Sequence, residues 1–186
     1  MKRWFVRHAP VLVNGVCYGH ADVPVVPVEE LTAHIHACVE AVASELGSLP
    51  LVVVSSPAVR CLELAEAVVE RLRQATHTPV CLRTDERLRE LHMGEWEGRS
   101  WTEIQETDEQ RLRQWMESWA TQAPPRGETP DALLLRVRDI LSEQSAEEAW
   151  LVVTHAGVIR AHWVMNQGSS WSEAMTREVP HAVVVR

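Results

Sequence analysis

The sequence predicts an α/β fold with three α/β/α layers and a mostly parallel central sheet. Two observations carry this prediction: short, continuous apolar runs recur along the chain, and amphipathic helical stripes separate them. Continuous rather than alternating apolar runs are typical of strands that are covered on both faces. Strands that alternate with helices favour a parallel sheet. The 186 residues, of which 46% are apolar and 24% charged, suffice for one domain with a full hydrophobic core.

Each expected element is defined by its apolar pattern. Five strands are predicted, over residues 4–6, 51–54, 80–83, 150–154 and 182–185. Apolar stripes at helical spacing predict helices over residues 31–46, 58–72 and 133–141. The third of these helices has Thr129 in place for its N-cap and Pro130 for its first position. We expect strands and helices to alternate.

The composition excludes several classes of function. A net charge of −8 argues against a nucleic-acid or membrane-surface partner, since no Lys/Arg cluster stands out. The four cysteines are widely spaced, which predicts free buried thiols rather than a zinc site or a disulfide framework. Charged residues interrupt the first apolar run after three residues, so no signal peptide is expected. We expect a cytoplasmic protein with a single domain over residues 1–186; a monomer and a homodimer both fit the sequence.

Charged residues follow three of the predicted strands at the point where each strand ends. "WFV" leads into Arg7 and His8, "LVVV" leads into a serine-rich turn with Arg60 beyond it, and "LVVT" leads into His155. In an open α/β sheet the carboxyl ends of the strands form the ligand crevice, so these side chains should converge. Two arginines and two histidines would form a cationic pocket that suits a phosphate group.

The position of Arg60 is a separate indication of an anion. A cation in the first turn of a helix opposes the helix dipole, so local helix stability does not explain it. An anion between the side chain and the helix N-terminus would explain it, whereas an arginine that extends along the surface to solvent is the alternative.

The segment "ERLRELHMGEWEGRSW", residues 86–101, is rich in carboxylates. One carboxyl near the pocket would serve as a general acid. A solvated acidic loop accounts for most of Glu86, Glu90, Glu95 and Glu97. Residues 92–128 are expected to form an excursion that flanks the site.

Six motifs in order carry a family resemblance: "VRHAP", "CYGHADVPV", "SSPAVRCLELAEAV", "RLRELHMGEWEG", "RGETPDALLLRV" and "VVTHAGVIRA". From residue 4 to about residue 164 the chain resembles the histidine phosphatase superfamily, which includes the cofactor-dependent phosphoglycerate mutases. The resemblance implies a phosphoglycerate mutase-like fold. Within the superfamily, "CYGHADVP" and "LRELHMGEWEGRSW" are most similar to the α-ribazole phosphatases, which implies removal of phosphate from α-ribazole 5′-phosphate in assembly of the cobalamin nucleotide loop.

The resemblance also implies roles for individual residues. His8 would be the nucleophile that becomes a phosphohistidine, and Glu90 would donate a proton to the leaving oxygen. His155 would act with two arginines on the phosphoryl oxygens. The positions that match phosphate-binding or adjacent sites of the family are Arg7, Arg60, Asn14, Gly19 and Ala156. No metal or cofactor is implied, and the partner is a small-molecule phosphomonoester.

The nearby arginines should lower the pKa of His8 and keep its imidazole neutral for attack. The chain departs from the usual family residues at Ala9, Val11 and Ala156. Ala9 in place of glycine requires a backbone φ below zero, and Val11 in place of threonine removes one hydroxyl that could contact phosphate.

Four other functions compete with this interpretation. A metal phosphoesterase would need ligands at regular spacing, which His8, Asp22, Glu90 and His155 do not have. A catalytically silent phosphate-binding module would not require the set of site residues. A broad sugar-phosphate phosphatase or a phosphoglycerate mutase-type enzyme stays open. The other histidines are expected at the surface or in structural roles, namely His20, His34, His36, His77, His92, His162 and His181. His20 and His92 lie beside site motifs, and a place in the wall of the crevice is the alternative for them. A packed stripe is expected for Trp115 and Trp119, and stacking of one tryptophan on a ligand is the alternative.

Overall fold

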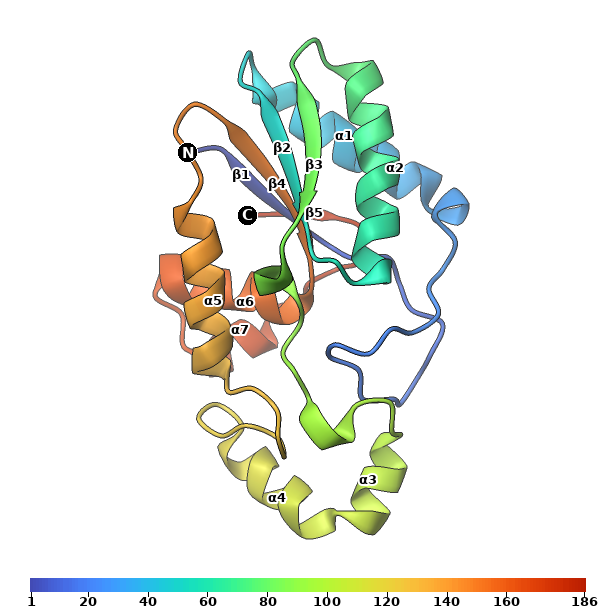
Figure 1. Cartoon of the computed structure of the whole chain (residues 1–186), viewed down its shortest axis with the longest axis vertical. Helices are drawn as coiled ribbons and strands as arrows, with labels where there is room; N and C mark the ends of the chain where they lie inside the picture. Colours follow the sequence, from blue (N-terminus) through green and yellow to red (C-terminus); the bar gives the residue numbers. More distant parts are fainter.

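The computed structural model describes residues 1–186 and places a five-stranded sheet between two layers of helices (Figure 1). The strands are β1 (Arg3–Arg7), β2 (Leu51–Ser55), β3 (Val80–Thr84), β4 (Ala149–Thr154) and β5 (Val184–Val185). Their order in the sheet is β3-β2-β4-β1-β5, with only β5 antiparallel to its neighbour. The predicted three-layer fold and mostly parallel sheet are confirmed.

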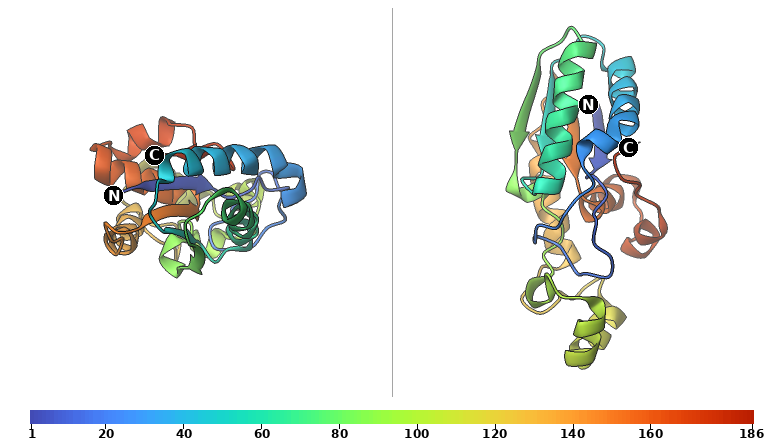
Figure 2. Two further views of the ribbon diagram at one scale, coloured as in Figure 1. Left: turned by 90° about the horizontal axis from the view of Figure 1, so that it is seen from above. Right: turned by 90° about the vertical axis from the view of Figure 1, so that its right-hand side faces the viewer.

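Four long helices cover the two faces of this sheet (Figure 2). They are α1 (Thr32–Leu46), α2 (Val59–Ala75), α5 (Pro130–Ser142) and α6 (Ala156–Gln167). Alternate residues of β1 supply both cores: Trp4 and Val6 pack with α1 and α2, whereas Phe5 packs with α5 and α6. Burial on both faces explains why the strands are continuous apolar runs.

The start of α5 follows the sequence signals. The hydroxyl oxygen of Thr129 accepts the backbone N–H of Ala132 at 3.1 Å, and Pro130 occupies the first turn.

The cysteines agree with the sequence prediction with one exception. Cys17, Cys38 and Cys61 are free and buried, as expected, but Cys81 is exposed because it lies on the edge strand β3.

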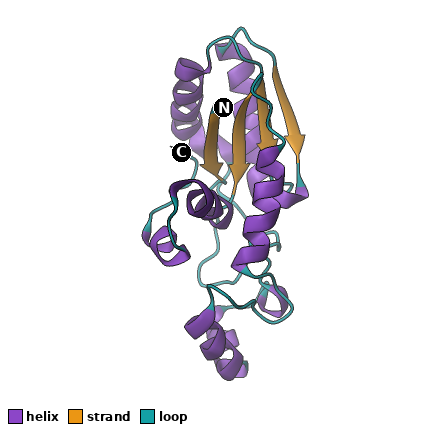
Figure 3. Ribbon diagram, turned by 90° about the vertical axis from the view of Figure 1, so that its left-hand side faces the viewer, coloured by secondary structure: helices purple, strands orange, loops and turns teal.

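The remaining elements surround the carboxyl ends of the strands. They are α3 (Trp101–Thr107), α4 (Glu109–Ser118), α7 (Trp171–Thr176) and the short 3-10 turns η1 (Val28–Leu31), η2 (Glu86–Leu88) and η3 (Gly94–Trp96). The strand arrows point toward the end of the molecule where α3 and α4 lie (Figures 1 and 3). A small separate core, with Trp96 and Ile104 at its centre, holds this region together. None of the helices has the length and apolar character to cross a bilayer.

Candidate active site

The site forms where the three neighbouring strands β2, β4 and β1 end. The backbone N–H of His8 donates to the carbonyl oxygen of Thr154 at 2.8 Å, and that of Ser56 donates to Val153 at 2.9 Å. These bonds extend the sheet by one residue beyond β1 and β2. They bring the imidazole rings of His8 and His155 to a centroid distance of 5.2 Å, so the predicted convergence at the sheet edge is confirmed.

His8 is almost fully buried, and its ring has a defined tautomer. Its Nδ1 lies 2.6 Å from the carbonyl oxygen of Ala9. Because a carbonyl oxygen only accepts, Nδ1 carries the proton and Nε2 carries the lone pair. Burial lowers the pKa of His8 to about 2, and the charges of Arg60, His181 and Arg7 add to that effect. The predicted direction is confirmed, but burial is a larger cause than the arginines.

His155 is fully buried at the start of α6. Its Nε2 lies 2.9 Å from the hydroxyl oxygen of Ser56 and 3.5 Å from Sγ of Cys61. Burial, followed by the charge of Arg60, lowers the pKa of His155 well below its ordinary value. The ring is therefore neutral, and Ser56 fixes its orientation. The serine-rich turn after β2 is recognisable in the sequence, but the sequence does not show that Ser56 contacts His155.

Two arginines enter the site without an acidic partner. Arg60 is only 1% exposed, and its guanidinium donates to the carbonyl oxygens of Gly19 at 2.6 Å and Ala21 at 2.9 Å. Arg7 donates to the carbonyl oxygen of Val179 at 2.9 Å. The Nε atoms of both arginines are buried and unpaired. A buried cation without a counter-charge is costly, so this arrangement is prepared for an anionic ligand, and the surface alternative for Arg60 is wrong.

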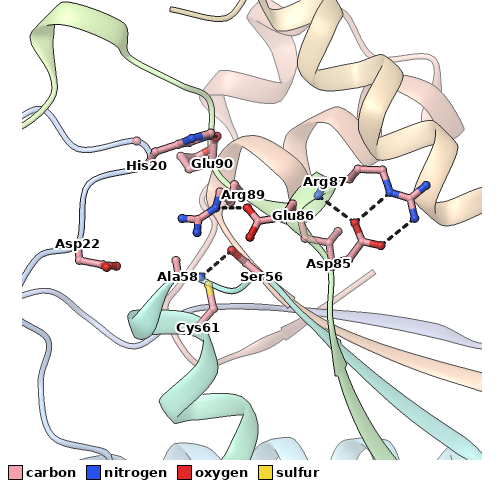
Figure 4. A network of polar contacts seen from close by, with 12 residues as sticks. His20, Asp22, Ser56, Ala58, Cys61, Asp85, Glu86, Arg87, Arg89 and Glu90 are labelled. Carbon is pink, nitrogen blue, oxygen red and sulfur yellow. Dashed lines mark hydrogen bonds and ion pairs between the residues drawn. The ribbon is translucent and has the colours of Figure 1, made fainter.

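Glu90 lies at the edge of the site, opposite the first turn of α6. Its carboxylate accepts the backbone N–H of Leu91 at 2.9 Å and of Gly157 at 3.2 Å. Its carbonyl oxygen accepts from Arg136 at 2.9 Å and lies 2.9 Å from Nε2 of His20. Figure 4 shows Glu90 beside His20. Both ends of the residue are therefore held in place.

The other three carboxylates of the acidic segment differ from one another. Glu86 and Glu95 form exposed ion pairs, Glu86 with Arg89 (Figure 4), in agreement with a solvated loop. The side chain of Glu97 is 13% exposed and accepts three backbone N–H groups. The donors are His20 at 2.8 Å, Met93 at 3.0 Å and Ala21. The solvated interpretation is wrong for Glu97, which joins two loops of the site.

The remaining site candidates have different surroundings. A Cβ on Gly19 would overlap the carbonyl oxygen of Leu91, so only glycine fits where this residue meets Arg60. Ala156 is buried as the first residue of α6. Asn14 is exposed and has no hydrogen bond, so its role stays a prediction. Ala9 is not among the non-glycine residues with positive φ, which meets the condition for alanine at that position.

An apolar cavity of about 600 Å³ opens beside Glu90. Twelve of its 16 lining residues are hydrophobic, and Glu90 and Arg160 are its charged residues. Trp115 packs against Trp96 with ring centroids 5.5 Å apart, as a structural stripe predicts. Trp119 instead follows the end of α4 and lines the cavity. The aromatic and methionine residues of the lining are Tyr18, Met93, Trp101, Trp115, Met116, Trp119, Trp171 and Met175.

Two of the remaining histidines lie beside each other near the backbone of Glu90, and a third contacts His8. The rings of His20 and His92 have centroids 4.7 Å apart and line a separate polar depression. His181 lies against His8, with ring centroids 5.0 Å apart. This contact could not be predicted from the sequence, because 173 residues separate the two histidines. No cluster of three or more His, Cys, Asp or Glu side chains has the arrangement of a metal site.

The amino-acid sequence is similar to those of two known phosphatases. The chain is 27% identical over 165 residues to the adenosylcobalamin/alpha-ribazole phosphatase of Escherichia coli K12, covering 86% of this chain and 75% of the relative. It is 33% identical over 123 residues to the glucosyl-3-phosphoglycerate phosphatase of Mycobacterium tuberculosis, covering 60% of this chain and about half (52%) of that relative.

Solved structures show the same fold. The alpha-ribazole phosphatase from Shigella flexneri superposes with a TM-score of 0.80 at 24% identity, over 99% of this chain and 88% of that one. The sequence profile of the Histidine phosphatase superfamily (branch 1) matches residues 3–186. The match covers nearly the whole chain, and the structure brings His8, Arg60 and His155 together at one edge of the sheet. The chain therefore belongs to the histidine phosphatase superfamily.

Proposed function

We propose that this protein is a phosphomonoesterase that acts through a phosphohistidine on His8. One observation carries the proposal: a buried, neutral imidazole with its lone pair on Nε2 lies beside two arginines that have no acidic partner. A phosphoryl group supplies the missing negative charge and the electrophile together. A silent binding module would not require the tautomer of His8 to be fixed.

The reaction would proceed in two displacements at phosphorus. Nε2 of His8 attacks, the P–O bond to the alcohol breaks, and Glu90 protonates the leaving oxygen. Water then attacks the phosphohistidine while Glu90 accepts its proton, which releases phosphate and restores His8. Arg7, Arg60 and His155 would hold the phosphoryl oxygens, since this chemistry depends mainly on positioning and charge stabilisation.

The preferred substrate we propose is α-ribazole 5′-phosphate, in assembly of the cobalamin nucleotide loop. The apolar cavity beside Glu90 supports this choice, because the leaving alcohol must extend from the site past Glu90. A lining of mostly aromatic and aliphatic side chains favours a flat heteroaromatic base over a sugar such as the one named for the mycobacterial relative.

Under this proposal residues 1–186 form one histidine phosphatase domain, in which residues 92–128 supply one wall of the cavity. The enzyme would work in the cytoplasm, without a metal or other cofactor. Activity in the presence of EDTA, compared with activity after adding Mg²⁺ or Zn²⁺, tests the last point.

The decisive experiment quenches the enzyme during turnover of a ³²P-labelled phosphomonoester and maps the label. We expect acid-labile, base-stable label on His8, and a fall in kcat of about 10³-fold or more in His8→Ala. His77→Ala is the matched control, because His77 is exposed and distant in sequence from every site motif. Label on another residue, or a fully active His8→Ala enzyme, would reject the mechanism.

The substrate is tested separately by comparing kcat/KM for α-ribazole 5′-phosphate, 3-phosphoglycerate, glucosyl-3-phosphoglycerate and fructose 2,6-bisphosphate. We expect α-ribazole 5′-phosphate to be hydrolysed with the highest kcat/KM. Efficient isomerisation of 3-phosphoglycerate would indicate a mutase, and faster hydrolysis of a sugar phosphate would indicate the broader phosphatase.

A further inference from the structure

The segment from Val179 to Ala182 is held against the residues that carry the reaction. The guanidinium of Arg7 donates to the carbonyl oxygen of Val179, and the backbone N–H of Ala182 donates to the carbonyl oxygen of Arg7, both at 2.9 Å. Between these two contacts, Nδ1 of His181 lies 2.9 Å from the carbonyl oxygen of His8. The ring of His181 also meets that of His8 edge to face.

The hydrogen bond from His181 has a definite direction. The carbonyl oxygen of His8 only accepts, so Nδ1 of His181 carries the proton and donates. Apart from this bond, the His8–Ala9 peptide makes only one hydrogen bond, and that bond is long. Its N–H reaches the carbonyl oxygen of Arg60 at a long 3.4 Å, and no other group donates to its carbonyl. His181 therefore holds the peptide that connects the nucleophile to Ala9.

That peptide sets the position of the next carbonyl along the chain. The carbonyl oxygen of Ala9 is the group that accepts the Nδ1 proton of His8. A rotation of the His8–Ala9 peptide would move this acceptor and release the imidazole. By holding the carbonyl of His8, His181 thus also helps to hold the carbonyl of Ala9, which sets the direction of the lone pair on Nε2 of His8.

Backbone strain next to His181 supports a specific role for it. Ala182 is buried and has φ of 53°, and it is one of two non-glycine residues with positive φ. This conformation is unfavourable for an L-residue other than glycine, because its Cβ comes too close to the following carbonyl oxygen. Strain of this kind persists only where surrounding contacts require it, and here the contacts made by Ala182 and by the residues just before it are those that hold Arg7 and His8.

We propose that His181 is a positioning residue for phosphoryl transfer, and that its Nδ1–H holds the His8–Ala9 peptide so that Nε2 of His8 points at phosphorus. The proposal rests on the function proposed for His8 above. A misplacement of about 1 Å at a reacting group can slow a reaction by about 10²-fold, so the effect should appear in the rate of phosphorylation rather than in phosphate binding.

Three substitutions distinguish the role of Nδ1 from that of bulk. In His181→Asn the side-chain amide N–H takes the place of Nδ1–H, in His181→Gln it is one bond further out, and in His181→Ala the donor is lost. The rate of the first turnover of p-nitrophenyl phosphate is measured by rapid quench, together with the affinity for orthovanadate. His77→Ala is the control for loss of an exposed histidine.

We expect His181→Ala and His181→Gln to slow the first turnover about 10- to 100-fold, with His181→Asn within about threefold of the unmodified enzyme. Vanadate affinity should change by less than about threefold in all of them, because the phosphoryl ligands are untouched. If His181→Ala does not fold, the comparison of Asn with Gln still decides, since both keep a polar amide.

Equal first-turnover rates for Asn and Gln, or a loss of vanadate affinity that parallels the loss of rate, would overturn the proposal. Failure of the underlying function has a different signature: the unmodified enzyme would then form no phosphohistidine on His8. The two failures are therefore separable in one set of measurements.

Discussion

The carboxylate of Glu90 accepts the backbone N–H of Gly157 at 3.2 Å, across the gap between the η2 loop and the first turn of α6. This contact depends on the absence of a side chain at Gly157. A Cβ built at that position would overlap Oε1 of Glu90 and approach a methyl of Leu133 at 3.3 Å. The glycine two residues after His155 thus leaves room for the proposed proton donor.

Gly157→Ala is therefore expected to displace Glu90 while leaving the phosphate ligands in place. We expect kcat to fall about 10²-fold, within the range for loss of a general acid, with vanadate affinity nearly unchanged. Gly168→Ala, directly after the end of α6, is the control. Gly168 has φ of 66° and open space around it, so alanine there should cost about 1–2 kcal/mol of stability without affecting kcat. Full activity of Gly157→Ala would contradict the role of Glu90.

The sequence predicted the parts of this site that depend on the sheet. His8, Arg60 and His155 each follow a strand whose apolar run is recognisable on its own. Parallel strands place their carboxyl ends at one edge, so their convergence follows from topology alone. The same reasoning predicted all five strands, although the last is reduced to Val184–Val185.

Contacts made by loops could not be predicted from the pattern of strands and helices. The bonds of Glu97 to residues 20, 21 and 93, and of His181 to His8, depend on how irregular segments lie in space. Glu97 resembled its solvated neighbours because a carboxylate that accepts backbone N–H groups has no distinct sequence pattern. The apolar cavity was missed on its α6–α7 side for the same reason: Trp171 and Arg160 meet Trp119 only after the chain has folded.

Glu97 supports Arg60 through the loop that carries Gly19 and Ala21. Its carboxylate accepts the N–H groups of His20 and Ala21, and the carbonyls of Gly19 and Ala21 hold the Arg60 guanidinium. In Glu97→Gln an amide NH₂ would face a backbone N–H, donor against donor. We expect a loss of about 1–3 kcal/mol of unfolding free energy and weaker vanadate binding.

Glu95→Gln is the matched control for this substitution. Glu95 lies on the same loop and pairs with Arg111 at the surface, so its loss should have little effect on either measurement. Urea unfolding and vanadate titration of both variants make the comparison. Unchanged vanadate affinity in Glu97→Gln would show that the Gly19–Ala21 loop holds Arg60 without it.

Stability should fall as the pH falls from 7 to 5. Burial lowers the pKa of His8 to about 2 and that of His162 to about 4. Below the unfolded value of about 6.5, the unfolded chain binds protons that the folded protein does not, so acid favours unfolding. The stability contributed by a neutral buried histidine is thus complete above this value and is lost on acidification.

His162 allows this dependence to be tested away from the active site, since its ring packs on Phe5 at a centroid distance of 4.3 Å. In His162→Gln the decrease in unfolding free energy from pH 7 to pH 5 should be smaller by about 1 kcal/mol, after allowance for its partial exposure. His34→Gln, at an exposed position, is the control. An identical pH dependence in His162→Gln and the unmodified protein would contradict the expectation.

Trp119 offers the sharpest test of what the cavity accepts. It lines the cavity and has no aromatic partner, unlike Trp115, whose ring packs on Trp96. Trp119→Leu keeps the lining apolar but removes a flat face on which a base can stack, an interaction worth about 1–3 kcal/mol. KM for α-ribazole 5′-phosphate should therefore rise about 5- to 100-fold, whereas KM for glycerol phosphate, which has no ring, should stay constant. A parallel rise for both substrates would indicate damage to the phosphate site, and no change for either would place the base outside this cavity.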